Sequence, residues 1–140
     1  MFLEAINKVN IKLGHDAFIA IILGSDQGRD LYKKKLIRQV EQYRLTNQVK
    51  FIGHCKNMPV AYKISDFVVS ASIEPEAFGR VSVEAQSMQK PVLASNIGGS
   101  KETIIDNKTG ILFESGNSED MSKKILELLN YDESTLNQMG

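Results

Sequence analysis

With 140 residues, of which 42% are hydrophobic and 24% charged, the chain has the length and composition of one globular domain. Lys plus Arg equals Asp plus Glu at 17 each, and a net charge near zero provides no field for holding nucleic acid or an anionic membrane. The longest apolar run, residues 17–23, is far shorter than the roughly 20 residues of a membrane span, and the N-terminus lacks the pattern of a signal peptide, so we predict a cytoplasmic protein.

In the first half of the chain the hydrophobic spacing alternates between that of helices and that of strands. It predicts a helix with Leu3, Ile6, Val9 and Leu13 inward, a strand over 17–23, a helix over 29–43 with Leu31, Leu36, Ile37 and Val40 inward, and a strand over 49–52. The near-continuous apolar run 17–23 is typical of a strand covered on both faces.

The second half continues the alternation and ends in an amphipathic helix. We expect a short helix over 57–64, a strand over 66–71, a helix over 79–88, a strand over 91–95, a short helix over 100–105, a strand over 111–113, and a last long helix capped by Asn117 or Ser118. This order predicts an α/β protein, with a Rossmann-like open parallel sheet and helices on both faces. Ligands of such sheets bind at the loops that follow the strands.

The loop after the third strand contains the most informative residues. Glu76 lies in this loop, Glu84 lies inside the helix that follows, and between them the amides of Gly79 to Val81 start the helix, which makes an anion site. A ligand with hydroxyls at both ends and phosphate in the middle fits this order. The spacing alone proves little, because Glu119 and Glu127 repeat it on a helix flank that we expect to be solvated.

The single cysteine, Cys55, follows His54 directly. No further Cys or His stands at zinc-binding spacing, so an ordinary loop or core position is a better interpretation than a metal ligand or a nucleophile.

Most of the chain resembles glycosyltransferase family four. The resemblance rests on residues 72–88 (SIEPEAFGRVSVEAQSM), 91–95 (PVLAS) and 98–102 (GGSKE), and it extends to 107–112, 53–54 and 61–66. It implies the GT-B fold, in which two Rossmann-like domains face each other and the C-terminal one binds the nucleotide sugar. Residues 1–140 would be that donor-binding domain.

The resemblance also implies roles for individual residues. Glu76 would bind hydroxyls of the transferred sugar, and the amides of Phe78, Gly79 and Arg80 would contact the sugar and diphosphate. Glu84 would bind the hydroxyls of the ribose, on which Val81 would pack. The loop with Gly53, His54 and Cys55 would lie against the base, and Gly24 would lie close to the nucleotide. Transfer would proceed with retention and without a divalent metal or other cofactor. We interpret Glu76 as an electrostatic stabiliser rather than a nucleophile.

The family's acceptor would be a glycan or a lipid-linked sugar, as in polysaccharide or lipopolysaccharide biosynthesis. Family members carry Gly-Arg and Lys-Gly pairs, whose cations neutralise the diphosphate, just upstream of the helix that matches residues 3–13. Neither pair is present here, so we expect the diphosphate clamp, its strand, the acceptor domain and the closing helices to be missing, and any membrane association to depend on the acceptor domain. The 140 residues alone should bind donor weakly and transfer nothing.

Two substitutions also differ from the family pattern, because Gln89 and Asn107 stand where glycine is usual.

Other functions remain as alternatives. The chain would alternatively be a non-catalytic nucleotide-binding or regulatory module, although a receiver-type signalling domain would need clustered acids that these loops lack. A GT-B epimerase or phosphorylase is the other alternative, and a phosphorylase would need a cofactor lysine that no motif indicates.

Overall fold

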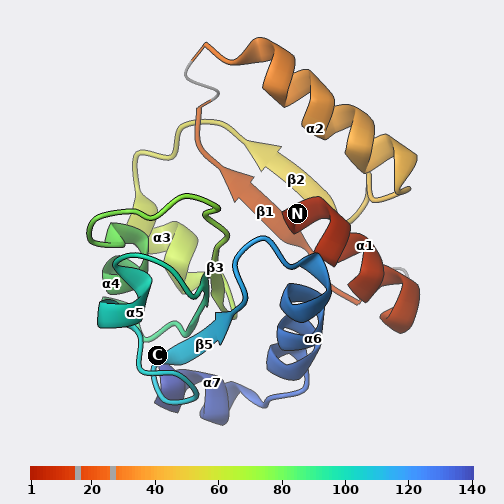
Figure 1. Ribbon diagram of the computed structural model, residues 1–140. Coiled ribbons are helices and arrows are strands. Elements are labelled where there is room, and N and C mark those ends of the chain that lie inside the picture. The colour runs from red at the N-terminus through yellow and green to blue at the C-terminus, as the bar shows by residue number, and fades with distance from the viewer. Residues whose placement is uncertain (15–16, 26–27) are drawn as a thin grey trace.

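The computed structural model describes residues 1–14, 17–25 and 28–140. Along the chain it contains α1 (Phe2–Leu13), β1 (Ala20–Leu23), α2 (Asp30–Gln42), β2 (Val49–Ile52), α3 (Met58–Lys63), β3 (Val68–Ser70), α4 (Arg80–Ser87), β4 (Val92–Ser95), α5 (Ser100–Thr103), β5 (Gly110–Phe113), α6 (Ser118–Leu129) and α7 (Glu133–Met139), as Figure 1 shows. The predicted order of helices and strands is confirmed from α1 to α6, and α7 follows as a further short helix.

All paired strands in the described residues run parallel, as predicted. They form two sheets, one with the order β1-β2 and one with the order β3-β4-β5. The register places Ala20 opposite Val49 in the first sheet, and Val92 between Val68 and Gly110 in the second. With helices on both faces, this is the predicted Rossmann-like α/β class.

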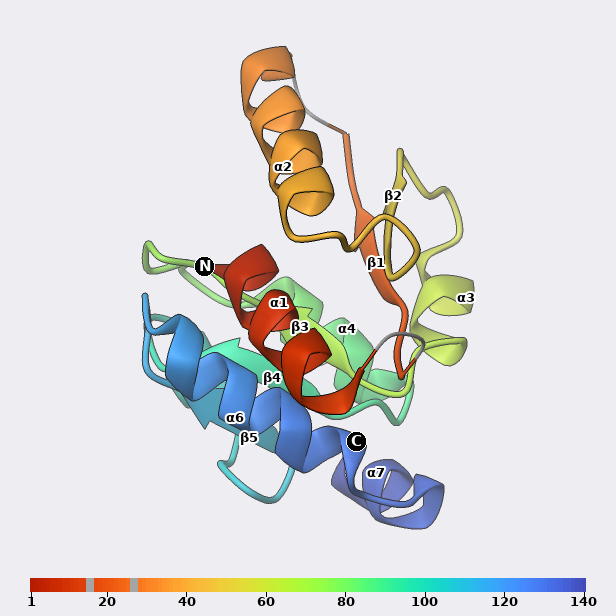
Figure 2. The ribbon, with the colours of Figure 1, turned by 90° about the vertical axis from the view of Figure 1, so that its right-hand side faces the viewer.

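The central strand β4 is fully buried, and its alternate residues face two different cores. On one face Leu93 packs in a large cluster with residues of α1, α6 and α7. The helices α1 and α6 lie side by side over this face in Figures 1 and 2. On the other face Val92 and Ala94 pack against Tyr62 of α3 and Ala85 of α4. The β3-β4-β5 sheet is thus covered on both faces, and α4, which follows β3, packs against one of them.

The first sheet is less covered than the sequence predicts. The strand starts at Ala20 rather than at residue 17, and Ile21 is 40% exposed, so the expectation of a strand buried on both faces is wrong. In α2 only Val40 is buried, while Leu31 is 84% exposed and Ile37 is 37% exposed. Within the described ranges β1 pairs only with β2, which leaves fewer partners for these apolar side chains.

The last long helix begins as predicted. The Asn117 side chain accepts hydrogen bonds from the amides of Glu119 and Asp120, which caps α6. No helix within residues 1–14, 17–25 and 28–140 is long and apolar enough to cross a membrane.

Candidate functional site

The start of α4 presents free backbone amides at the carboxyl end of β3. Gly79 precedes the helix with a left-handed φ of 74°. Its carbonyl accepts from the amide of Ser82, whereas the amides of Gly79, Arg80 and Val81 have no hydrogen bond to any described residue. Three free N–H groups at the positive end of a helix dipole are the arrangement that an anion site requires, so the anion site stays a prediction at this position.

Glu76 lies beside this helix start. Its Oε1 atom is buried without a hydrogen-bond partner among the described residues, and it lies 3.4 Å from the point that a Cβ on Gly79 would occupy. A buried carboxylate oxygen without a partner is costly, by about 1–3 kcal/mol for an unsatisfied acceptor. A hydrogen-bond donor that reached this oxygen would satisfy it.

A glycine pair fixes the loop that contains Glu76. Gly98 and Gly99 approach this loop so closely that a Cβ on Gly98 would lie 2.6 Å from the Glu76 carbonyl oxygen, and one on Gly99 would lie 2.6 Å from the Phe78 carbonyl carbon. The amide of Gly99 donates to the carbonyl of Glu76 at 2.9 Å. The glycine pair therefore packs against the loop.

Glu84 is exposed on α4, and Tyr62 of α3 holds its carboxylate. The Tyr62 hydroxyl donates to Glu84 Oε2 at 2.8 Å, while the ring is only 5% exposed. Burial raises the pKa of Tyr62 to about 12, and the hydrogen bond to Glu84 acts in the same direction. Nothing in the sequence signals this contact, because the two residues come from different elements.

The other predicted ligand contacts at α4 lie at the surface. Phe78 is 61% exposed, Val81 is 39% exposed and Arg80 is exposed as well. Exposed apolar side chains next to free amides are available to a ligand. The structure thus brings Glu76, the start of α4 and Glu84 onto one helix and the loop before it.

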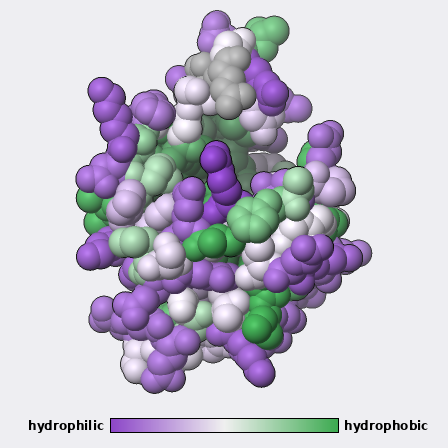
Figure 3. All heavy atoms as spheres, turned by 90° about the vertical axis from the view of Figure 1, so that its left-hand side faces the viewer, coloured by the Kyte–Doolittle hydropathy of each residue, from purple (hydrophilic) through white to green (hydrophobic). Residues whose placement is uncertain are grey.

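The predicted nucleotide loops meet at the other sheet. Gly24, with φ 136°, follows β1 and donates to the Ile52 carbonyl at 3.3 Å, and Gly53 follows β2. Both glycines line a hollow of about 370 Å³ under α2. Figure 3 shows the side of the molecule that lies on the left in Figure 1, where apolar atoms are visible at the bottom of a depression. His54 is exposed and Cys55 is a half-buried free thiol.

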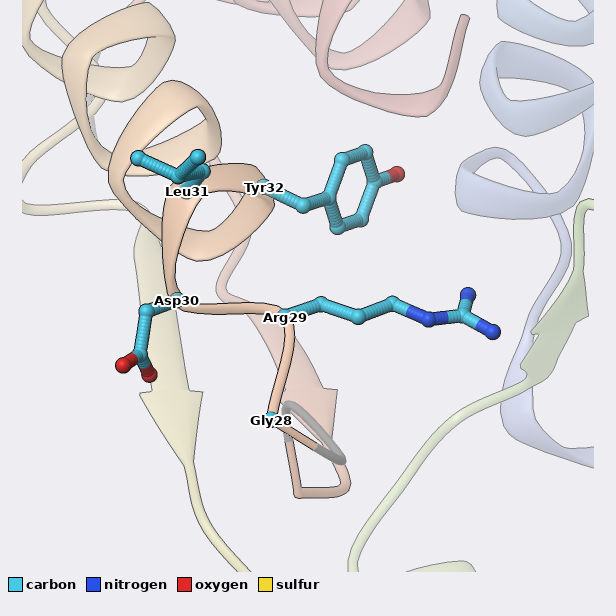
Figure 4. Close-up of a pocket in the computed structure, with 5 residues that line it drawn as sticks. All are labelled: Gly28, Arg29, Asp30, Leu31 and Tyr32. Carbon is cyan, nitrogen blue, oxygen red and sulfur yellow. The ribbon is translucent and has the colours of Figure 1, made fainter.

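A second hollow, of about 400 Å³, lies at the start of α2. In Figure 4 the side chains of Arg29 and Tyr32 extend to the same side of the helix, and Asp30 points away from them. No motif in the sequence points to Arg29, Asp30 or Tyr32. Across the described residues no group of three or more His, Cys, Asp or Glu side chains could hold a metal ion.

A Rossmann-like α/β domain with free helix amides at the carboxyl end of a strand has the architecture in which ligands bind at that end of the sheet. The family model for glycosyl transferases group 1 matches residues 1–140. The chain therefore belongs to the group 1 glycosyltransferases.

Individual relatives agree with this assignment. The chain is similar to an uncharacterized glycosyltransferase of Methanocaldococcus jannaschii, with 35% identity over 76% of this chain and 32% of the relative. It is similar to Anabaena HepE, solved with UDP-glucose, at 28% identity and a TM-score of 0.87, over 99% of this chain and 37% of that one. It is also similar to the solved C-terminal domain of a group 1 glycosyl transferase (LpcC) from Francisella tularensis, at 31% identity and a TM-score of 0.84, over 99% of this chain and 71% of that one.

The chain spans only about a third of the first of these relatives, 32% of its length. None of these likenesses assigns a role to an individual residue of this chain, and the roles of Glu76, Glu84 and the loops stay predictions.

Proposed function

We propose that this chain is the donor-binding domain of a retaining glycosyltransferase that transfers a sugar from a nucleoside-diphosphate sugar to a glycan or lipid-linked acceptor. The observation that carries the proposal is the buried, unpartnered Oε1 of Glu76 beside the free amides at the start of α4. One end of this arrangement accepts hydrogen bonds from sugar hydroxyls, and the other binds phosphate oxygens.

We assign the diphosphate, the ribose and the base of the donor to the groups around Glu76. The amides of Phe78 to Arg80 bind the diphosphate and the sugar, and the exposed carboxylate of Glu84 accepts hydrogen bonds from the ribose. The hollow that Gly24 and Gly53 line takes the base, and His54 and Cys55, which directly follow Gly53 in the chain, contact it through the same loop. The UDP-glucose bound by Anabaena HepE is the type of donor that supports this assignment.

We further propose that the acceptor domain lies outside these 140 residues. The chain spans 37% of Anabaena HepE, which supports this. Within the described ranges β1 and β3, like β2 and β5, each pair on one side only. A parallel strand contributed from outside the 140 residues would complete the sheet. The cations that neutralise the diphosphate would belong to the same missing part.

In the mechanism we propose, the donor is cleaved with retention and without a metal ion. Charge develops on the leaving diphosphate, and the dipole and amides of α4 stabilise it. The carboxylate of Glu76 stabilises the positive charge that develops on the sugar. Transfer by the complete enzyme should therefore persist in the presence of a chelator.

The test is a titration of the 140-residue chain with UDP, GDP, ADP and their glucose conjugates, followed by the amide NMR signals of α4. We expect weak binding in the millimolar range, because each missing charge-assisted bond to phosphate removes about 1.5–3 kcal/mol. Glu76→Ala should remove the preference for the sugar conjugate over the free diphosphate, and Glu74→Ala, an exposed residue of the same loop, should not. Absence of binding by every nucleotide would refute the proposed function. Micromolar binding or measurable transfer would refute the proposal that the cations that bind the diphosphate lie outside these 140 residues.

A further inference from the structure

Two properties of Tyr62 distinguish it from an ordinary core residue. Its ring is packed in the smaller core between α3, α4 and β4, with Ala85, Val92 and Ala94. Its hydroxyl leaves this core and donates to Glu84 Oε2 at 2.8 Å, where the glutamate is exposed. A donor held by a buried ring has one position, whereas an exposed glutamate by itself samples several rotamers.

We propose that Tyr62 is a positioning residue, whose hydroxyl fixes the carboxylate of Glu84 so that its other lone pairs accept hydrogen bonds from both ribose hydroxyls of the donor nucleotide. This inference rests on the proposed function, which assigns the ribose to Glu84.

The number of acceptor sites is sufficient for both contacts. An ionised carboxylate has about four lone-pair sites. Tyr62 uses one of them on Oε2, and Glu84 is exposed, so the remaining sites are open to a ligand. The two hydroxyls of a ribose are adjacent, and binding both requires two acceptor sites at a fixed separation and orientation. A carboxylate that Tyr62 holds in one rotamer supplies such a pair before the nucleotide arrives.

The protonation state of Tyr62 suits this role. The pKa of Tyr62 is raised to about 12, so its hydroxyl remains a donor throughout the neutral range. The contact also links α3 to α4, which follow different strands. The position of Glu84 therefore depends on the core packing of Tyr62 as well as on its own helix.

The chain contains a matched control for this contact. Tyr131 donates to Glu127 Oε1 at the same distance, 2.8 Å, from the segment between α6 and α7. Both pairs join a tyrosine hydroxyl to a helical glutamate, but Glu127 belongs to α6 and not to the candidate site. Removing the Tyr131 hydroxyl therefore reproduces the loss of such a hydrogen bond without touching Glu84.

The experiment measures the preference for ribose in the 140-residue chain. UDP, GDP and ADP are titrated in parallel with their 2′,3′-dideoxy counterparts, in the wild-type chain and in Tyr62→Phe, Tyr131→Phe and Glu84→Gln. Tyr62→Phe keeps the buried ring, and its fold is verified by circular dichroism and denaturant unfolding. We expect Tyr62→Phe to weaken binding of the ribonucleotide about 2- to 10-fold, as expected when one long side chain must be ordered on binding, and to leave the dideoxy nucleotide unchanged.

The outcomes separate this inference from the proposed function. If Tyr62→Phe and Tyr131→Phe both keep the wild-type ratio of the two affinities while Glu84→Gln lowers it, Glu84 binds the ribose and Tyr62 has no positioning role. If Glu84→Gln also keeps the ratio, the ribose role of Glu84 is wrong and the inference fails with it. A fall of the ratio in Tyr62→Phe and Glu84→Gln, but not in Tyr131→Phe, supports the proposal.

Discussion

Replacing Gly98 by alanine tests whether the glycine pair sets the position of the Glu76 loop. Gly98 has φ 52°, and a Cβ there would lie 2.6 Å from the carbonyl oxygen and 2.9 Å from the amide nitrogen of Glu76. A left-handed alanine costs about 1–2 kcal/mol, and overpacking against backbone costs about 1–3 kcal/mol. The free energy of unfolding should therefore fall by about 2–5 kcal/mol.

Gly116→Ala is the matched control. Gly116 has φ 80°, but nothing lies within 4 Å of its Cβ position, so only the conformational cost of about 1–2 kcal/mol applies. Urea unfolding of the chain and its two variants measures both losses. In Gly98→Ala the amide signals of residues 76–80 should also move, because the loop must shift. Equal destabilisation by the two substitutions, with unchanged loop signals, would refute the packing role of Gly98.

Three further predictions concern stability, and each is measured by denaturant unfolding. Gln89 adopts the left-handed φ of 58°, which glycine adopts without strain, so Gln89→Gly should raise the free energy of unfolding by about 0.5–1 kcal/mol. In the control Lys35→Gly, inside the regular helix α2, glycine should lower it by about 1 kcal/mol. Asn117→Ala should lower it by about 1 kcal/mol, because two amides of α6 lose their cap; no change would show that water replaces the cap. The pKa of Tyr62 is raised to about 12, so the protonated hydroxyl contributes fully to the free energy of unfolding below pH 10, and this contribution is lost as the pH rises toward 12. The free energy of unfolding should therefore fall over this pH range, and it should fall less in Tyr62→Phe.

The sequence predicted those elements whose local pattern and tertiary surroundings agree. In α6 the cap at Asn117 and the apolar spacing of Met121, Ile125 and Leu128 indicate the same helix, and all three apolar side chains are buried. In α2 the spacing of Leu31 is equally regular, but the residue is 84% exposed. Periodicity identifies a helix, whereas burial depends on which elements are present to cover it.

The candidate site was predictable to the same degree. The loop with Glu76 and the helix start at Gly79 could be located, because the position after a parallel strand and the glycine are local features. The supporting contacts could not be located. Gly98 and Tyr62 each act on a residue about twenty positions away in the chain, and no periodicity or spacing rule connects such pairs.

The stability of Glu76 variants distinguishes a binding group from a structural one. Oε1 of Glu76 lies buried without a described partner, so the free protein loses stability through this oxygen. Glu76→Met keeps the volume of the side chain and removes the acceptor, and it should raise the free energy of unfolding by about 1 kcal/mol, the lower end of the cost of an unsatisfied group, since the side chain is only half-buried. The same variant should lose the preference for a sugar nucleotide over the free diphosphate. A structural carboxylate would behave in the opposite way, because its replacement would destabilise the fold and leave sugar binding intact.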